Sequence, residues 1–172
     1  MNEAGHWFPS LENEGGSAHP WARSLGDLCS SLLGAGVGDY IAQGYLARSD
    51  KAVVRVRIRG GKAFLTVKSS VNGVTRQEYE YEVPLPDAEE MLQLCEGPCI
   101  EKHRHLLPAG DGRHTWEVDV FHGANEGLIV AEIELADEQE PFPRPEWLGE
   151  EVSSDARYFN CNLAEHPYRE WR

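Results

Sequence analysis

Charged side chains recur at every second position in several stretches of this sequence, and each stretch carries a single sign. The basic stretches contain Arg55, Arg57 and Arg59, then Lys68, then Lys102 and Arg104. The acidic stretches contain Glu78, Glu80 and Glu82, then Glu117 and Asp119, then Glu132 and Glu134. Arginine and lysine bind phosphate oxygens, whereas carboxylates bind hard divalent cations such as Mg²⁺ and Mn²⁺. Brought together, these residues would suit a polyphosphate that is bridged to divalent metal.

The spacing of two predicts β-strands, because successive side chains of a strand point to opposite faces. Val54, Val56 and Ile58 alternate with the arginines, so this strand has one apolar and one ionic face. Strands are predicted at about 40–47, 53–59, 62–69, 75–83, 100–107, 114–121 and 127–135. Gly60-Gly61 predicts a hairpin between the second and third of these. Hairpin-length breaks favour an antiparallel arrangement.

The expected fold class is therefore all-β, or β-dominated α+β, with an antiparallel sheet closed into a barrel of about eight strands. Helices would pack outside this barrel. They are predicted over 87–96, with Asp87 as N-cap, over 20–33, and as a short helix from about Pro145. If the ionic faces point inward, the barrel is a tunnel lined by both signs. If they point outward, the protein is a plain β-barrel interaction module with a solvated surface.

Composition limits the classes of function. Sixteen lysines and arginines against 29 aspartates and glutamates give the 172-residue chain a net charge of −13, which argues against broad binding to nucleic acid or to an anionic membrane. No apolar run approaches the ~20 residues that a membrane helix needs. Four cysteines are too sparse for a disulfide scaffold. These features predict a cytoplasmic, single-domain protein whose oligomeric state the sequence leaves open.

A different site is conceivable around Cys95, Cys99, His103 and His105, which are ligand types that zinc accepts. The cysteine spacing is wider than in most structural zinc sites, and the histidines would face away from Lys102 and Arg104. Surface or packing roles are the simpler interpretation of these four residues. Glycine-rich phosphate loops and nucleophile elbows are absent from the sequence.

The ordered set of segments resembles the CYTH superfamily, the triphosphate tunnel metalloenzymes, over about residues 40–168. This family includes bacterial inorganic triphosphatases, thiamine triphosphatases and class IV adenylyl cyclases. The matching segments are Gln43-Gly44-Tyr45-Leu46, Val54-Arg55-Val56-Arg57-Ile58, Phe64-Leu65-Thr66-Val67-Lys68, Arg76-Gln77-Glu78-Tyr79-Glu80, Ile100-Glu101-Lys102-His103-Arg104, Trp116 to Phe121, Val130 to Leu135, Gly149 to Val152, and Arg157 to Asn160. The resemblance implies a tunnel domain over 40–172 and a divergent segment over 1–39.

The resemblance also implies roles for individual residues. Phosphate would be bound by Arg55, Arg57, Lys68, Lys102, Arg104 and Arg157. The metal, Mg²⁺ or Mn²⁺, would be bound by Glu132 and Glu134, with help from Asp119 and Glu117. Glu78 and Glu80 would add carboxylates to the tunnel, and Lys68, Lys102 and Glu80 are the predicted catalytic residues. The implied reaction is attack of water on a terminal phosphoryl group of a small-molecule triphosphate, most simply inorganic tripolyphosphate.

One hallmark of the family, a Glu-x-Glu-x-Lys first strand whose glutamates bind metal, is missing. The nearest match is Leu11-Glu12-Asn13-Glu14-Gly15-Gly16, where glycine stands in place of the lysine. Two functions therefore remain open from the sequence. One is hydrolysis, if Glu12 and Glu14 reach the tunnel. The other is a catalytically weak or inactive tunnel that binds polyphosphate or a nucleotide without turnover.

Overall fold

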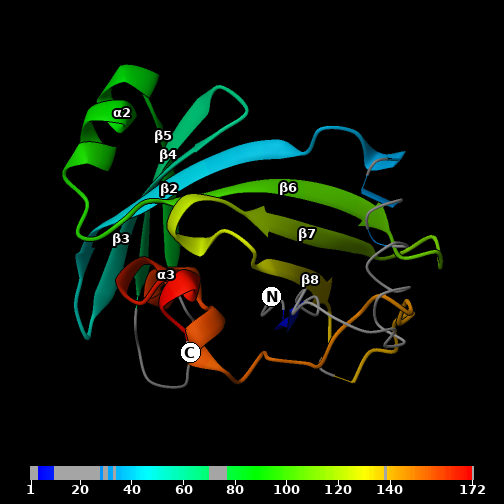
Figure 1. Ribbon diagram of the computed structural model, residues 1–172. Coiled ribbons are helices and arrows are strands. Elements are labelled where there is room, and N and C mark those ends of the chain that lie inside the picture. Colours follow the sequence, from blue (N-terminus) through cyan, green and yellow to red (C-terminus); the bar gives the residue numbers. More distant parts are fainter. Residues whose placement is uncertain are drawn as a thin grey trace.

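A computed structural model describes residues 4–9, 28, 31–32, 34–69, 77–137 and 139–171. Eight strands form one antiparallel sheet in the order β1-β8-β7-β6-β2-β3-β4-β5 (Figure 1). Their bounds are β1 Ala4–Pro9, β2 Asp39–Arg48, β3 Ala52–Arg59, β4 Lys62–Ser69, β5 Glu78–Val83, β6 Ile100–Pro108, β7 Thr115–Phe121 and β8 Ile129–Leu135. The seven predicted strands are all present, and their antiparallel direction is confirmed.

The sheet is open among these residues, because β1 and β5 stand at the two ends of the strand order. The prediction of about eight antiparallel strands is confirmed, and each of the charged strands has one apolar and one ionic face. The predicted closure of the sheet into a barrel is not seen among these residues. β5 begins at Glu78, three residues later than predicted, and nearly all of its residues are exposed. Tyr79 and Tyr81 are 50% and 59% exposed, so this strand has the character of an edge.

The helix α2, Leu85–Gln93, covers the apolar face of β2, β3 and β4 (Figure 1). Ala88 packs there in one cluster with Val56 and Ala63, all of them at most 1% exposed. The helix starts two residues before the predicted one, and its N-cap is Pro84 rather than Asp87. Proline is tolerated in the first turn, where its missing N–H has no helical partner, so Pro86 does not prevent this earlier start.

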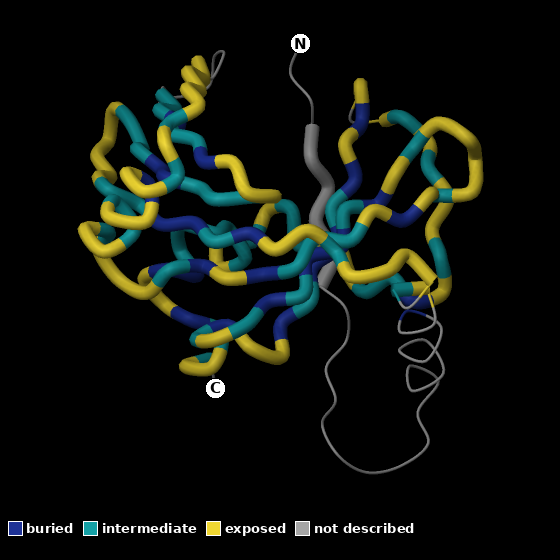
Figure 2. Tube along the Cα trace, turned by 90° about the horizontal axis from the view of Figure 1, so that it is seen from above, coloured by how far each residue is buried: buried dark blue, intermediate teal, exposed yellow. Residues whose placement is uncertain are grey.

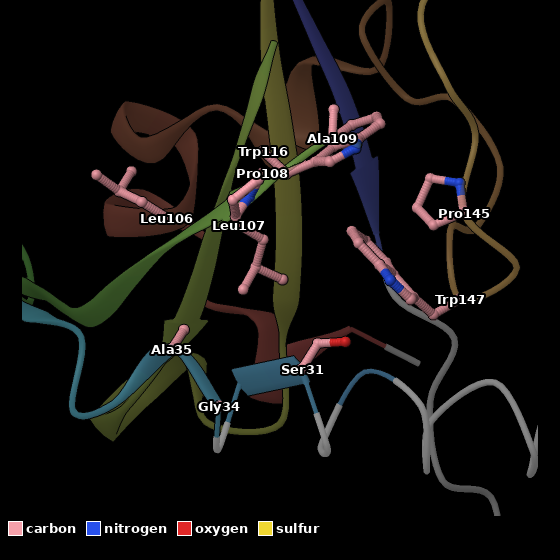
Figure 3. Close-up of a pocket in the computed structure, with 10 residues that line it drawn as sticks. All are labelled: Ser31, Gly34, Ala35, Leu106, Leu107, Pro108, Ala109, Trp116, Pro145 and Trp147. Carbon is pink, nitrogen blue, oxygen red and sulfur yellow. The ribbon is translucent and has the colours of Figure 1, made fainter. Parts of the chain in front are cut away.

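A second apolar cluster lies on the corresponding face of β6, β7 and β8, where Leu107, Trp116 and Ile133 are buried. The Trp116 ring makes edge contacts with Trp147 and Phe142. The chain forms a turn at 146–147, so the short helix predicted from Pro145 is not found. Leu107, Trp116, Pro145 and Trp147 border a cavity of about 310 Å³ (Figure 3).

The predicted helix over 20–33 is described only in part. Leu28, Ser31 and Leu32 are helical, as are Gly34 and Ala35 beyond its expected end. Leu28 is 1% exposed and belongs to the cluster around Trp116. The rest of this predicted helix lies outside the described residues.

A third apolar cluster occupies the ionic face of the sheet at one end. Ile100, Phe121 and Val130 share strand faces with the charged residues of β6, β7 and β8, and Leu163 of the helix α3, Asn160–Glu165, packs on them. This helix and α2 lie on opposite sides of the sheet (Figure 1). Short 3-10 helices follow β7 at Gly123–Asn125 (η1) and flank α3 at Ala156–Tyr158 (η2) and Tyr168–Glu170 (η3).

Most buried residues lie along the strands, and the connecting loops are largely exposed (Figure 2). The ionic face is covered by α3 at one end, and a cavity lies on that face beside the helix. None of the described helices is long and apolar enough to cross a membrane.

Candidate active site

A cavity of about 660 Å³ lies on the ionic face of the sheet, next to α3. Its charged lining consists of five basic side chains, Arg48, Arg55, Arg57, Lys68 and Arg104, and five acidic ones, Glu78, Glu80, Glu117, Glu132 and Glu134. Each predicted strand of the charged pattern thus contributes at least one residue to a single space. The cavity brings together four of the six predicted phosphate ligands and three of the four predicted metal ligands.

Arg55 is joined to Glu80 through a hydroxyl between them. The Arg55 Nη2 donates to Thr66 Oγ1 at 3.1 Å, and that hydroxyl donates to Glu80 Oε2 at 2.9 Å. Arg55 Nη2 and Glu80 Oε2 are 3.7 Å apart. The Arg55 Nε is buried and has no hydrogen-bond partner among the described residues. Since a buried unpaired donor is costly, this atom favours an anionic ligand in the cavity.

Lys68 and Glu78 form the next pair along the same strands. Their side chains are 3.1 Å apart, from Nζ to Oε2, and both are more than two-fifths exposed. They are direct partners in the pairing of β4 and β5. Because the pair is solvated, its contribution to stability is small, and either residue can exchange its partner for a ligand.

Arg57 is held by a neutral residue. Its Nε donates to Gln43 Oε1 at 3.1 Å, and the two residues are direct partners in the pairing of β2 and β3. Burial lowers the pKa of Arg57 to about 10, with further lowering by the positive charges of Arg55 and Arg104. Arg57 stays protonated at neutral pH. A bound anion would offset the cost of keeping this positive charge out of water.

Arg104 is the centre of a network of carboxylates. Its Nε and Nη2 donate to the two oxygens of Asp119, each at 2.7 Å, and its Nη1 donates to Glu117. Glu132 Oε2 is 3.6 Å from Nη2. Burial opposes the charge of Arg104, but the hydrogen bonds and charge of Asp119, with Glu117 and Glu132, outweigh it and raise the pKa.

Lys102 and Asp119, two of the predicted site residues, lie beneath the cavity rather than in its lining. Lys102 is 1% exposed, and its Nζ is 2.5 Å from Asp119 Oδ2. Burial alone would raise the pKa of Asp119. The charge of Lys102 and the hydrogen bonds from Arg104 lower this pKa by a larger amount, so the net shift is downward. Both residues support Arg104 from below.

The predicted metal ligands give a partial set of oxygen donors. Glu117 and Glu132 are direct partners in the pairing of β7 and β8, and both line the cavity together with Glu134. Carboxylate oxygens suit Mg²⁺ or Mn²⁺, so the donor chemistry fits. The described residues hold no group of three or more carboxylate, histidine or cysteine ligands already gathered around one point. Part of the set is engaged by Arg104 instead.

Arg157 stands apart from the cavity. Its guanidinium is 2.6 Å from Asp155 Oδ2 and lies over the ring of Trp171, 5.1 Å from its centroid. About two-thirds of the side chain is exposed. The structure therefore does not bring this predicted phosphate ligand together with the others.

The cavity also contains residues that the charge pattern did not single out. Arg48 at the end of β2 pairs with Glu165 of α3 at 2.7 Å, and Tyr45, Asn160 and Cys161 complete the wall near α3. The signal for Tyr45 and Arg48 is their place two and five residues after Gln43, in the same strand. Asn160 ends the matching segment Arg157 to Asn160, whereas the charge pattern gives no signal for Cys161, because α3 reaches the sheet only through tertiary packing.

The strand β1 occupies the place next to β8, with Trp7 opposite Glu132 and Gly5 opposite Glu134. It runs over Ala4–Pro9, whose sequence has neither carboxylates nor lysine. Glu12 and Glu14, the predicted substitutes for the missing motif, lie outside the described residues. The four residues considered for zinc do not form a metal cluster in the described part of the chain; His103 Nδ1 instead lies 2.7 Å from His122 Nε2.

Comparison with known proteins agrees with this architecture. The CYTH domain model matches residues 39–168. An inorganic triphosphatase of Acetivibrio thermocellus is 47% identical over 148 residues, covering 86% of this chain and 92% of that protein. An inorganic triphosphatase of Nitrosomonas europaea is 38% identical over 127 residues, covering 72% and 83%. The crystal structure of the inorganic triphosphatase NE1496 matches with a TM-score of 0.65 at 29% identity, covering 95% of each chain. The chain belongs to the CYTH family, as its motifs predicted.

Proposed function

We propose that this protein hydrolyses inorganic tripolyphosphate in a divalent-metal-dependent reaction that releases phosphate. The observation that carries the proposal is the cavity in which four predicted phosphate ligands face five carboxylates. The two relatives named inorganic triphosphatase support the choice of substrate. The equal numbers of basic and acidic side chains suit a polyanion and its metal ions together better than either alone.

The basic residues bind and orient the substrate. Arg55, Arg57 and Lys68 line one wall from β3 and β4, and Arg104 faces them from β6. In-line attack on a phosphoryl group needs this kind of positioning and charge neutralisation more than covalent catalysis. Arg157 is the outermost member of the proposed set and would contact phosphate only by leaving Asp155.

Three residues have proposed catalytic roles. Lys68 stabilises negative charge on the reacting phosphoryl group, and Glu80, oriented by Thr66, accepts a proton from the attacking water. Lys102 is too deeply buried to contact substrate where it stands, so we assign it an indirect role. It holds Asp119, and through Asp119 it holds Arg104.

Glu132 and Glu134 are the proposed metal ligands, with Glu117 beside them. Asp119 is the least available of the predicted set, because both of its oxygens already accept hydrogen bonds from basic side chains. A bound Mg²⁺ or Mn²⁺ would offset the carboxylates and supply a water of lowered pKa. Arg104 orients two of these carboxylates, Glu117 and Glu132.

The proposal includes a closed tunnel, which forms when metal and substrate are bound. Glu78 and Glu80 on the edge strand β5 line the same cavity as Glu132 and Glu134 on β8, which is the neighbour of the other edge strand, β1, so negative charge lies near both edges of the open sheet. Metal and substrate would remove that repulsion and let the edges approach. We expect backbone amides of β5 to exchange more slowly with solvent when both are bound.

The proposed partner is thus a small molecule. The net charge of −13 gives no support for nucleic acid or an anionic membrane as a ligand. A cytoplasmic location stays a prediction from the sequence.

The test is phosphate release from tripolyphosphate with Mg²⁺ or Mn²⁺, comparing the wild type with Glu132→Gln. The expected result is release by the wild type and its loss in the variant, because the amide keeps the shape but loses the charge. Glu89→Gln on the exposed side of α2 is the matched control and is expected to behave as wild type. Unchanged release by Glu132→Gln would contradict the proposed metal site.

A second candidate, binding without turnover, is favoured by one observation. The positions of β1 opposite Glu132 and Glu134 are Trp7 and Gly5, so this strand brings no carboxylate to them. Metal-dependent binding of tripolyphosphate without release of phosphate would identify this second function.

A further inference from the structure

Gln43 is a fully buried polar residue that does not line the cavity but is hydrogen-bonded to Arg57, which does. It is 0% exposed and lies in β2, paired with Arg57 of β3 on one side and with Ile100 of β6 on the other. A buried amide is costly unless it is hydrogen-bonded, so its partners indicate why it is there. Its Oε1 accepts from Arg57 Nε at 3.1 Å, and its Nε2 donates to Tyr45 Oη at 3.4 Å.

The orientation of this amide is determined by its neighbour. A guanidinium has donors only, so the oxygen of Gln43 must face Arg57 and the NH₂ group must face Tyr45. The hydroxyl of Tyr45 is neutral at physiological pH, and burial raises its pKa further. Gln43, which accepts from Arg57, and Tyr45, which accepts from Gln43, are therefore both uncharged.

This neutrality distinguishes Arg57 from the other basic residues of the cavity. Arg48 and Lys68 have carboxylate partners at 2.7 and 3.1 Å, and Arg55 has one at 3.7 Å. Arg104 is surrounded by three carboxylates. Among the described residues, no carboxylate lies within 4.0 Å of the Arg57 guanidinium, although the side chain is partly buried.

We infer that Gln43 is a positioning residue whose neutral amide holds Arg57 in place without cancelling its charge, so that this charge is reserved for the triphosphate. A glutamate at this position would hold the guanidinium as well or better, but it would neutralise it. The inference rests on the proposed function, because it takes the triphosphate as the anion. Gln43 thus contributes to the affinity for the triphosphate, although it is buried and does not contact the ligand itself.

The test compares two substitutions in calorimetric binding of tripolyphosphate with Mg²⁺. Gln43→Glu is nearly isosteric and keeps an acceptor for Arg57, yet we expect affinity to fall about a hundredfold, because an added charge opposes the anion at close range. Gln43→Leu loses the hydrogen bond but adds no charge, and we expect a loss of about tenfold. A purely structural role predicts the reverse order, since Gln43→Glu is the smaller change in shape and polarity.

Gln93→Glu, at the exposed end of α2, is the matched control for one added negative charge and should bind as wild type does. Equal affinity of Gln43→Glu and wild type would overturn the inference, as would a larger loss in Gln43→Leu than in Gln43→Glu.

A second measurement separates this inference from the proposed function. In the ligand-free protein, the NMR signal of the Arg57 Nε–H should be protected from exchange in the wild type and in Gln43→Glu, and exchange rapidly in Gln43→Leu. If the wild type binds no tripolyphosphate, the proposed function fails, and these signals still decide whether Gln43 positions Arg57. Rapid exchange in the wild type would overturn the positioning role.

Discussion

Glu117 of β7 and Glu132 of β8 are directly opposite one another in the sheet, and Arg104 of β6 lies against both. Like charges in such a pair destabilise a sheet unless a cation lies between them. In the structure described, that cation is the guanidinium of Arg104. A divalent metal at the same carboxylates would take over this role and leave the Nη1 of Arg104 available for phosphate, while Asp119 would keep its Nε and Nη2.

This relationship predicts that tripolyphosphate binds much more weakly without divalent metal. With a chelator present, the five carboxylates of the cavity face the substrate unneutralised, and we expect affinity to fall at least about tenfold. In the double variant Glu117→Gln, Glu132→Gln the difference between metal and chelator should shrink. Calorimetric titration measures both effects, and equal affinity of the wild type in metal and in chelator would refute the prediction.

Arg55→Lys should weaken binding even though it preserves the charge. Arg55 donates its Nη2 to Thr66, and its buried Nε has no partner within the part of the chain that the structure describes. Lysine has no planar fork, so a bidentate contact to phosphate is lost, and we expect KM for tripolyphosphate to rise about tenfold. Arg157→Ala is the comparison, because that side chain is already paired with Asp155 and two-thirds exposed. We expect it to raise KM only a few-fold, and a larger effect than that of Arg55→Lys would contradict this ranking.

The buried pair of Lys102 and Asp119 predicts loss of stability in acid. The pKa of Asp119 is lower in the folded protein than its ordinary value. Its contribution is therefore fully present above the unfolded pKa of about 4 and is lost as pH falls through the folded pKa. Thermal unfolding from pH 7 to pH 3 should show a steeper decline of Tm for the wild type than for Asp119→Asn.

At neutral pH, Asp119→Asn leaves Lys102 buried without a full counter-charge. We expect this to cost about 3–5 kcal/mol in the free energy of unfolding. Parallel declines of Tm in acid for the two proteins would show that Asp119 does not carry the effect.

The sequence alone predicts the strands and most of the cavity, because both leave a pattern of period two. Arg55 and Arg57 reveal a strand, its ionic face and a phosphate site in one local signal. The same pattern cannot show which charged side chains are already paired with one another. Arg104 opposes Asp119 only through the pairing of β6 with β7, and this long-range register draws Lys102 and Asp119 below the cavity.

Other differences also come from interactions that local pattern does not encode. Arg157 is held by Asp155, two residues away, in a turn that the sequence analysis did not predict. The openness of the sheet depends on whether β1 and β5 pair, and each strand alone looks much the same in a barrel and at an edge. Gln43 carries no charge, so the alternation of charged residues gives no sign of its role.

Gly44 shows how closely the end of α2 and the bend that follows it approach the sheet behind the cavity. A Cβ added to Gly44 would lie 2.9 Å from Cys95 Cβ and closer still to its Sγ. The backbone hydrogen bond from Glu96 N to Tyr45 O, at 3.2 Å, holds the end of this helical segment against β2. The helix therefore cannot move away without breaking a contact of the strand that carries Gln43. We expect Gly44→Ala to lower the free energy of unfolding by about 1–3 kcal/mol through overpacking.

Gly34→Ala is the control, because a Cβ there meets no atom within 4 Å, and it should be neutral or slightly stabilising. Adding Cys95→Ala to Gly44→Ala removes the sulfur that causes the clash and should recover part of the loss. Urea unfolding of the single and double variants measures this coupling as a double-mutant cycle. Strictly additive effects would mean that α2 does not press on β2 at Gly44.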